Sequence, residues 1–202
     1  MKYIYTTLVA TLMFTGTSFA ETINVPTDQP TIAAAISVSV NGDVIAIAAG
    51  TYYEHSLNPN GKAITIGSAS GNLDVTIDAN WGGGVFRFNS GESNGTVIKD
   101  LVITGGYSTS HGGGIYCTGS NPTISGCTIS GNLAGSQGGG IMCRNNSDPT
   151  ITDCTIEGNE ANEGGGIGCT YGSDPTISNC TIEANRAYSP GGGIFCEYSS
   201  YP

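Results

Sequence analysis

Basic residues are scarce in this sequence. Of its 202 residues only six are Lys or Arg, against sixteen Asp and Glu, so the formal net charge is −10. Nucleic acids and anionic membranes are therefore disfavoured as partners, because binding them requires a surface rich in cations. An acidic polysaccharide is also repelled by the molecule as a whole, although a local site can override that total.

Helix-forming patterns are scarce as well, and the one long apolar stretch lies at the N-terminus. Lys2 precedes an apolar run from Leu8 to Phe14, and Ser18-Phe19-Ala20 has the small residues of a cleavage signal. Residues 1–20 are thus predicted to be a secretory signal peptide, with the mature chain beginning at Glu21. No later segment could cross a bilayer. We expect a secreted or cell-surface protein with no transmembrane segment once the signal is removed.

Glycine, by contrast, is abundant, with 32 residues. It has no three-residue period, which excludes collagen, and a regularly arranged hydrophobic content of 38% can form a core, which disfavours disorder. Four triple glycines are each followed by Ile, one free position and Cys. They are Gly112–Gly114, Gly138–Gly140, Gly164–Gly166 and Gly191–Gly193, and the Ile residues that follow them are 26, 26 and 27 residues apart.

The segment between the triple glycines repeats too, as Pro-Thr-Ile, then Cys-Thr-Ile, then Asn, starting from Pro122, Pro149 and Pro175. A fixed period of this length indicates stacked units that bury their apolar faces against one another. Within a unit the apolar residues alternate and are β-branched, which favours short strands. We therefore predict one all-β domain, a parallel β-solenoid with three short strands per coil, in which equivalent residues of adjacent coils lie roughly 4.8 Å apart.

The start of the mature chain differs from these repeats. Pro30 to Ile36 has apolar residues at helical spacing, and we predict a short helix that covers the otherwise open first coil. The domain, residues 21–202, is expected to divide into irregular coils over 43–111 and regular coils of 26–27 residues over 112–202. In the irregular part, Val44–Ile47 is predicted as the first strand. The first coil is then completed by Lys62–Ile66 and Val75–Asp78, and the second is formed by Val85–Phe88 and Val97–Thr104, with Leu101 in the place later held by Cys.

Two resemblances agree with this prediction. The run from Pro30 through Gly42-Asp43-Val44-Ile45 to Gly50-Thr51-Tyr52-Tyr53-Glu54 resembles the opening of many pectin-lyase-like right-handed β-helix proteins, and its last five residues are similar to a scaffold signature of pectin methylesterases. The pairing of Ile-x-x-Asn with Gly-Gly-Gly-Ile resembles the repeats of polymorphic outer-membrane proteins, which carry Phe and Ala where this chain has Ile and Gly. These resemblances imply a right-handed parallel β-helix and no particular reaction. The last coil stops at Pro202, the counterpart of Pro149, so we expect C-terminal truncation.

Several repeated residues have a structural interpretation. Asn132, Asn159 and Asn185 recur where a turn must form and are predicted to make a ladder, and His111 is predicted to be a corner residue. All seven cysteines lie in two columns. Disulfides and two inward columns of buried thiols are both compatible with a secreted protein, and the sequence leaves these alternatives open. The columns are Cys117, Cys143, Cys169 and Cys196, and Cys127, Cys154 and Cys180.

Four acidic residues are the candidate metal ligands. Asp148 is expected to stack over Asp174, and Glu157 over Glu183, which places like charges roughly 5 Å apart. A calcium ion between them is one outcome, because calcium binds oxygen ligands. Solvated carboxylates are the other, because calcium takes about six or more ligands and each pair offers few. No other cofactor is predicted.

No complete catalytic site is visible. A polysaccharide lyase needs a cation that acidifies the sugar carbon and a base that takes its proton. The available basic residues do not fall at equivalent repeat positions beside an acidic cluster; they are Lys62, Arg87, Lys99, Arg144 and Arg186. We therefore predict a β-helix scaffold or binding protein that contacts an extracellular polysaccharide or another cell-surface component along a strand face. The alternative is a fragment of a polysaccharide lyase of the pectate-lyase type.

Overall fold

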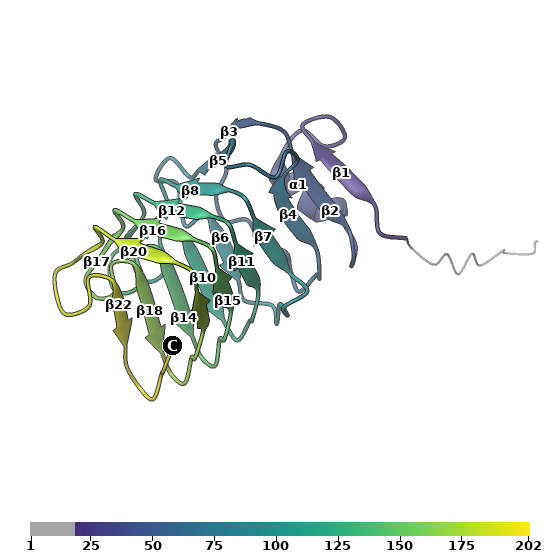
Figure 1. Ribbon diagram of the computed structural model, residues 1–202. Coiled ribbons are helices and arrows are strands. Elements are labelled where there is room, and N and C mark those ends of the chain that lie inside the picture. Colours follow the sequence, from purple (N-terminus) through teal and green to yellow (C-terminus); the bar gives the residue numbers. More distant parts are fainter. Residues whose placement is uncertain (1–18) are drawn as a thin grey trace, which may run out of the picture.

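The computed structural model describes residues 19–202, so the predicted signal peptide lies outside the described residues except for Phe19 and Ala20. The described chain winds into a parallel β-solenoid of about seven turns, here called coils. Figure 1 shows the strands of successive coils side by side, with the purple N-terminal elements at one end of the stack and the yellow ones at the other. The predicted all-β solenoid is confirmed.

Four parallel sheets run along the stack. Sheet A has seven strands: β1 (Thr22–Val25), β2 (Val44–Ile47), β4 (Thr65–Ser68), β7 (Val97–Lys99), β11 (Thr123–Ser125), β15 (Thr150–Thr152) and β19 (Thr176–Ser178). Sheet B has six: β3 (Gly50–Tyr52), β5 (Val75–Asp78), β8 (Val102–Thr104), β12 (Thr128–Ser130), β16 (Thr155–Glu157) and β20 (Thr181–Glu183).

The other two sheets are shorter. Sheet C has five strands: β6 (Phe86–Phe88), β10 (Ile115–Thr118), β14 (Ile141–Arg144), β18 (Ile167–Thr170) and β22 (Ile194–Cys196). Sheet D has four strands of two residues: β9 (Tyr107–Ser108), β13 (Leu133–Ala134), β17 (Glu160–Ala161) and β21 (Arg186–Ala187). The expected three strands per coil were wrong for the regular coils. The residues after the buried Asn approach the next coil closely enough to pair as a fourth, very short strand.

The irregular coils also begin elsewhere than expected. β1 pairs with β2, so Val44–Ile47 is the second strand of sheet A. β2 in turn pairs with β4, so Thr65–Ser68 belongs to the coil after that of Val44–Ile47 and does not complete the same coil. The reason is that strands of one sheet follow each other from coil to coil, and an apolar pattern alone does not say which sheet a strand joins. Leu101 takes the place of Cys127, as predicted, because Val102 pairs with Thr128.

The core is built from columns of Ile. In sheet A the buried Ile66, Ile98, Ile124 and Ile151 pair in register, and comparable columns run through sheets B and C. Side chains alternate between the two faces of each strand, so every second residue points into the stack. Burying one such side chain is worth about 1.5–3 kcal/mol, and the columns extend this gain along the whole solenoid.

The predicted helix covers the first coil. α1 (Ile32–Val38) starts two residues later than expected and buries Ile32, Ala35 and Ile36 against the core. Thr31 caps its N-terminus by accepting from the Ala34 N–H at 3.0 Å. The Glu54 carboxylate accepts the N–H groups of Ile32 at 2.8 Å and Ala33 at 2.9 Å. Glu54 is thus a scaffold residue that satisfies two N–H groups which a helix start leaves unpaired.

The asparagines form the predicted ladder. The buried Asn159 accepts through Oδ1 from the backbone N–H of Asn132 at 3.0 Å and from its side-chain Nδ2 at 2.9 Å. Its own Nδ2 donates to the Ile129 carbonyl at 2.8 Å. Asn185 repeats these contacts one coil further on. The ladder therefore satisfies polar backbone groups at a corner where no sheet hydrogen bond is available.

A buried serine ladder supports the corner that precedes sheet A. The backbone N–H of Ser120 donates to Ser147 Oγ, and that of Ser147 to Ser173 Oγ, each at 3.1 Å. The ladder ends on Glu92, which is 1% exposed and accepts from Ser120 Oγ at 2.8 Å. Glu92 also accepts the N–H of Gly61 at 2.9 Å. This carboxylate is therefore fully engaged inside the scaffold.

Each of the three glycine positions in a triple excludes a side chain for a different physical reason. The first, such as Gly138, has a φ of +67° that disfavours side chains. A Cβ on the second, Gly139, would lie 2.4 Å from the Glu160 carbonyl oxygen, and one on the third, Gly140, would lie 3.0 Å from Asn159 Nδ2. The recurrence of Asn together with the triple glycine thus has a packing cause, because the amide lies against the third glycine.

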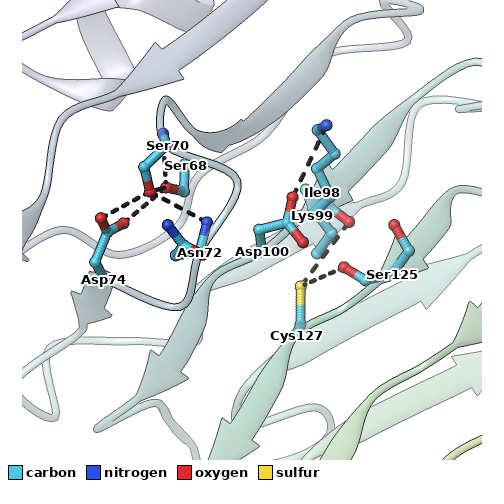
Figure 2. Close-up of polar contacts among 9 residues, drawn as sticks. All are labelled: Ser68, Ser70, Asn72, Asp74, Ile98, Lys99, Asp100, Ser125 and Cys127. Carbon is cyan, nitrogen blue, oxygen red and sulfur yellow. Dashed lines mark hydrogen bonds and ion pairs between the residues drawn. The ribbon is translucent and has the colours of Figure 1, made fainter.

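The cysteine columns are in register, and their thiols are free. Cys117, Cys143 and Cys169 stack in sheet C and are buried. In the second column the Cys127 thiol donates to the Ser125 carbonyl oxygen at 3.3 Å, as Figure 2 shows. Of the two alternatives that the sequence left open, the structure contains the inward columns of thiols.

Local hydrogen bonds shape the irregular part of the chain. In the segment that joins β4 to β5, the hydroxyls of Ser68 and Ser70 each donate to the Asp74 carboxylate at 2.7 Å (Figure 2). These contacts lower the pKa of Asp74. The Asn72 N–H donates to Ser70 Oγ at 3.1 Å. This longer connection is therefore ordered by its own side chains.

Removing one ladder residue tests the fold. Asn159→Ala leaves the buried Asn132 N–H without its acceptor, and we expect unfolding free energy to fall by about 2–4 kcal/mol, because each buried polar group left unpaired costs about 1–3 kcal/mol. Urea denaturation measures the loss. Asn94→Ala, at an exposed turn, is the matched control, with an expected change within about 0.5 kcal/mol. Equal effects of both substitutions would contradict the ladder.

Thiol labelling tests the cysteine columns. Burial raises the pKa of the Cys117 thiol, so little thiolate forms at neutral pH and a reagent has no access. We expect iodoacetamide to label the exposed Cys196 first and Cys117 only after unfolding, as followed by peptide mass spectrometry. Detection of a reducible bridge at Cys117 in the native protein would contradict this arrangement.

Candidate functional site

The predicted calcium ligands Asp148 and Asp174 belong to the scaffold. The Asp148 carboxylate accepts the backbone N–H of Asp174 at 2.7 Å, and Asp174 accepts that of Tyr201 at 2.6 Å. The Asp148 N–H donates to Asn121 Oδ1 at 2.7 Å. The two residues are stacked as expected, and one carboxylate oxygen of each accepts a backbone N–H group from the next coil.

Glu157 and Glu183 form a separate pair. They stack in register at the ends of β16 and β20, in sheet B, whereas the aspartates precede sheet A. The structure thus brings each pair together but not the four residues into one set. Among residues 19–202, no group of three or more His, Cys, Asp or Glu side chains is arranged to hold a metal ion. Calcium binding between the members of a pair stays a prediction.

A pocket at the N-terminal end also carries carboxylates. It has a volume of about 410 Å³ and is lined in part by Glu21, Asp28 and Asp43. Backbone N–H groups donate to two of these residues: that of Asn24 lowers the pKa of Asp28, and those of Val40 and Glu21 lower the pKa of Asp43. The carboxylates therefore hold the chain around the cap, and the size of the pocket by itself indicates no chemistry.

The best candidate site is a groove on the outer face of sheet C. It has a volume of about 270 Å³, and six polar or aromatic residues line it: Arg87, Ser108, Ser110, His111, Tyr116 and Arg144. Arg87 and Tyr116 pair in register on β6 and β10. Their neighbours along the strands, such as Phe88 and Cys117, point into the core. Strand alternation therefore requires Arg87 and Tyr116 to face outward.

The second wall of the groove comes from the segment that follows sheet D. Ser108 ends β9, and Ser110 and His111 lead into the triple glycine. The Ser110 hydroxyl and His111 Nδ1 are hydrogen-bonded, and His111 forms a bridge with Gln137 of the next coil. His111 is thus a corner residue, as predicted, but it also lines the groove. The turn at Gly112 brings its ring beside Tyr116, with centroids 6.4 Å apart.

Aromatic stacking holds both guanidinium groups. The Arg87 guanidinium lies 5.1 Å from the centre of the Tyr116 ring, and that of Arg144 lies 4.9 Å from the centre of the Tyr171 ring. Tyr171 in turn stacks on Tyr198, with centroids 4.7 Å apart. Guanidinium and aromatic groups therefore form a continuous surface on this face, here called the sheet C strip: Arg87, His111, Tyr116, Arg144, Tyr171 and Tyr198.

The electrostatic environment of the groove is cationic. His111 is partly buried, and burial together with the nearby Arg144 charge lowers its pKa. Neither arginine of the groove forms an ion pair among the residues that the structure describes. The Nε atom of Arg144 is buried without a hydrogen-bond partner, and so is the hydroxyl of Thr170, which pairs with Arg144 across the strands.

Sequence reasoning missed this site because it compared basic residues only at equivalent repeat positions. Arg87 pairs with Tyr116, whereas Arg144 pairs with Thr118, two residues further along the strand. Two residues apart on a strand means the same face. The signal was therefore present in the alternation pattern, but not in the repeat alignment.

Most of the chain matches a known protein family. Residues 62–201 match the family model described as a right-handed β-helix region. That range contains the whole sheet C strip. The searches of curated proteins and of solved structures gave no match. In the described residues, the single helix is too short to span a membrane, and no other candidate span is found.

Substitution of Arg144 tests the electrostatics of the groove. Without the neighbouring charge, Arg144→Gln should raise the pKa of His111 towards its ordinary value of 6.5. A lowered pKa means that the unfolded state binds the proton more tightly, so the wild type loses stability as the pH falls below about 6.5 and the variant loses less. Nuclear magnetic resonance titration of the imidazole signals measures the shift. The sequence has two histidines, and a His55→Gln variant assigns them. An unchanged or lower pKa of His111 would contradict this geometry.

Proposed function

The chain belongs to the right-handed β-helix family, and from this premise we propose that it is a secreted or cell-surface scaffold that binds glycans along the sheet C strip. The observation that carries the proposal is the groove, where guanidinium, imidazole, hydroxyl and aromatic groups converge on one rigid face. Binding sites typically combine apolar or aromatic surface with a few placed polar groups. Tyr and Arg are also the residues that contribute most to binding energy.

The form of the strip suits an extended ligand. His111 comes from the segment between β9 and β10, and the other members come from β6, β10 and β14 and from the residues that follow β18 and β22. The strip therefore crosses successive coils. The strands of a parallel sheet are spaced at roughly 4.8 Å, and a linear polysaccharide can contact several of them at once. The exposed rings of Tyr171 and Tyr198 extend the contact surface beyond the groove. Secretion is supported by the pattern of residues 1–20.

The composition of the groove favours a binding protein over a lyase. Its six lining residues include no Asp or Glu, whereas a calcium-assisted elimination requires carboxylates that hold the cation. The predicted calcium candidates do not line the groove: Asp148 and Asp174 lie at the corner before sheet A, and Glu157 and Glu183 lie on sheet B. Unsaturated product released from polygalacturonate in the presence of calcium would favour the lyase alternative.

Removal of aromatic rings tests the proposal. Tyr116→Ala and Tyr198→Ala should each weaken glycan binding by about 5- to 30-fold, which corresponds to about 1–2 kcal/mol per buried anchor. A glycan array identifies a ligand and calorimetry measures its affinity for each variant. Tyr53→Ala removes another exposed ring, outside the strip, and should leave the affinity unchanged. Equal losses in all three variants, or no glycan bound by the wild type, would refute the assignment.

A further inference from the structure

We infer that Arg87 and Arg144 form a binding site for an oxyanionic substituent, such as a sulfate or carboxylate group, on a saccharide whose anionic groups are sparse. The inference rests on the proposed function and adds the chemical class of the ligand. Its evidence consists of the charges, the unsatisfied polar atoms and the geometry of the groove.

The described basic residues divide into two sets. Lys62 donates to the carbonyl groups of Ile36 and Ser39, Lys99 lies 3.8 Å from the Asp100 carboxylate, and Arg186 lies 3.7 Å from the Glu160 carboxylate. These three side chains have their partners within the scaffold.

The other set consists of Arg87 and Arg144. Both line the same groove, and neither has a carboxylate partner among residues 19–202. Guanidinium groups present several N–H donors in a planar array that matches oxyanions. Among the described Lys and Arg side chains of this protein of net charge −10, Arg87 and Arg144 are the two with neither an ion pair nor a backbone carbonyl partner, and they share one surface cavity. This is the arrangement expected when an external anion supplies the partner.

Two unsatisfied polar atoms lie beside the groove, one on its lining residue Arg144 and one on Thr170, which pairs with Arg144. Thr170 is fully buried and its hydroxyl has no hydrogen-bond partner, and the buried Nε of the adjacent Arg144 has none either. Such atoms are rare in folded proteins, since an unpaired buried polar group is costly. An anion bound at the exposed end of the Arg144 guanidinium would compensate its charge.

The site is preorganised. The Arg87 guanidinium stacks on Tyr116 and that of Arg144 stacks on Tyr171, so both are held in position before a ligand arrives. Binding then costs less side-chain entropy. The hydroxyls of Ser108 and Ser110 line the same groove, and they suit the hydroxyl groups that surround an anionic substituent on a sugar ring.

The net charge limits the ligand to one with sparse anionic groups. The molecule as a whole repels a polyanion. Only the two guanidinium groups of the groove are available to pair with the negative charges of such a ligand. A chain with an anionic group on every unit would place its other charges along a face where Glu163 and Glu197 influence Tyr198. A single sulfate or carboxylate on an otherwise neutral saccharide meets the cations without that repulsion.

The test uses the full chain and four probes. These are inorganic sulfate, and neutral, monosulfated and monocarboxylated forms of one oligosaccharide, with affinities measured by calorimetry. We expect sulfate to bind weakly and either anionic form to bind at least about tenfold more tightly than the neutral form, one order of magnitude being the usual effect of a charged hydrogen bond. The two anionic forms distinguish sulfate from carboxylate as the preferred group.

Variants locate the effect. Arg87→Gln and Arg144→Gln should each reduce the preference for the anionic forms by about tenfold, whereas Arg87→Lys should retain part of it because the charge remains. Lys99→Gln, which removes a cation outside the groove, is the matched control and should change nothing. Thermal unfolding of each variant confirms that it is folded. A preference that survives both Gln substitutions in folded protein would overturn the inference.

Failure of the inference and failure of the proposed function are distinguishable. Neutral and anionic oligosaccharides binding equally would overturn the anion site while the glycan-binding function stands. Sulfate binding that is lost in the Gln variants, with no oligosaccharide bound, would support the anion site and refute the glycan-binding function. A separate titration with polygalacturonate tests the density of anionic groups, and tighter binding of this polymer than of either monoanionic form would overturn the conclusion that the anionic groups are sparse.

Discussion

The structure depends on the stacking of equivalent residues in register along parallel strands. Within the regular coils this register places Ile on Ile in the core and Asn on Asn in the ladder, so one sequence pattern satisfies both the core and the corners. The side-chain ladders matter because sheet hydrogen bonds end at each corner, and backbone groups left there would be buried without partners. Asn159 supplies such partners at the corner after sheet B, and Ser147 and Asp148 supply them at the corner before sheet A.

The triple glycines determine where the coil can close. Sheet D strands approach the glycines so closely that a Cβ on Gly139 would meet the Glu160 backbone. This close approach brings the segment from sheet D to sheet C over the outer face of sheet C. In one coil the segment carries Ser110 and His111 and forms a wall of the groove. In the next coil Met142 fills the position that corresponds to Tyr116 and is fully buried.

Local charge and total charge have different consequences in this molecule. The carboxylates at Glu54, Glu92 and Asp148 accept backbone N–H groups and belong to the scaffold. The two guanidinium groups of the groove have no such role. The total of −10 therefore describes long-range repulsion, whereas recognition at short range depends on Arg87 and Arg144, which are held by aromatic rings.

The repeat pattern by itself determined the solenoid, the Ile and Cys columns and the Asn ladder, because each depends on a periodicity that is visible in the chain. The helical spacing of apolar residues in the segment from Pro30 to Ile36 likewise determined the helix that covers the first coil, although α1 begins two residues late. Only the tertiary structure decided the fourth strand of each regular coil, the place of β1, and the separation of Asp148 and Asp174 from Glu157 and Glu183. It alone brought His111 and Arg144 to Arg87 and Tyr116. The physical reason is that the repeat specifies which residues stack between coils, whereas the path of the chain around each corner sets which side chains meet across a coil.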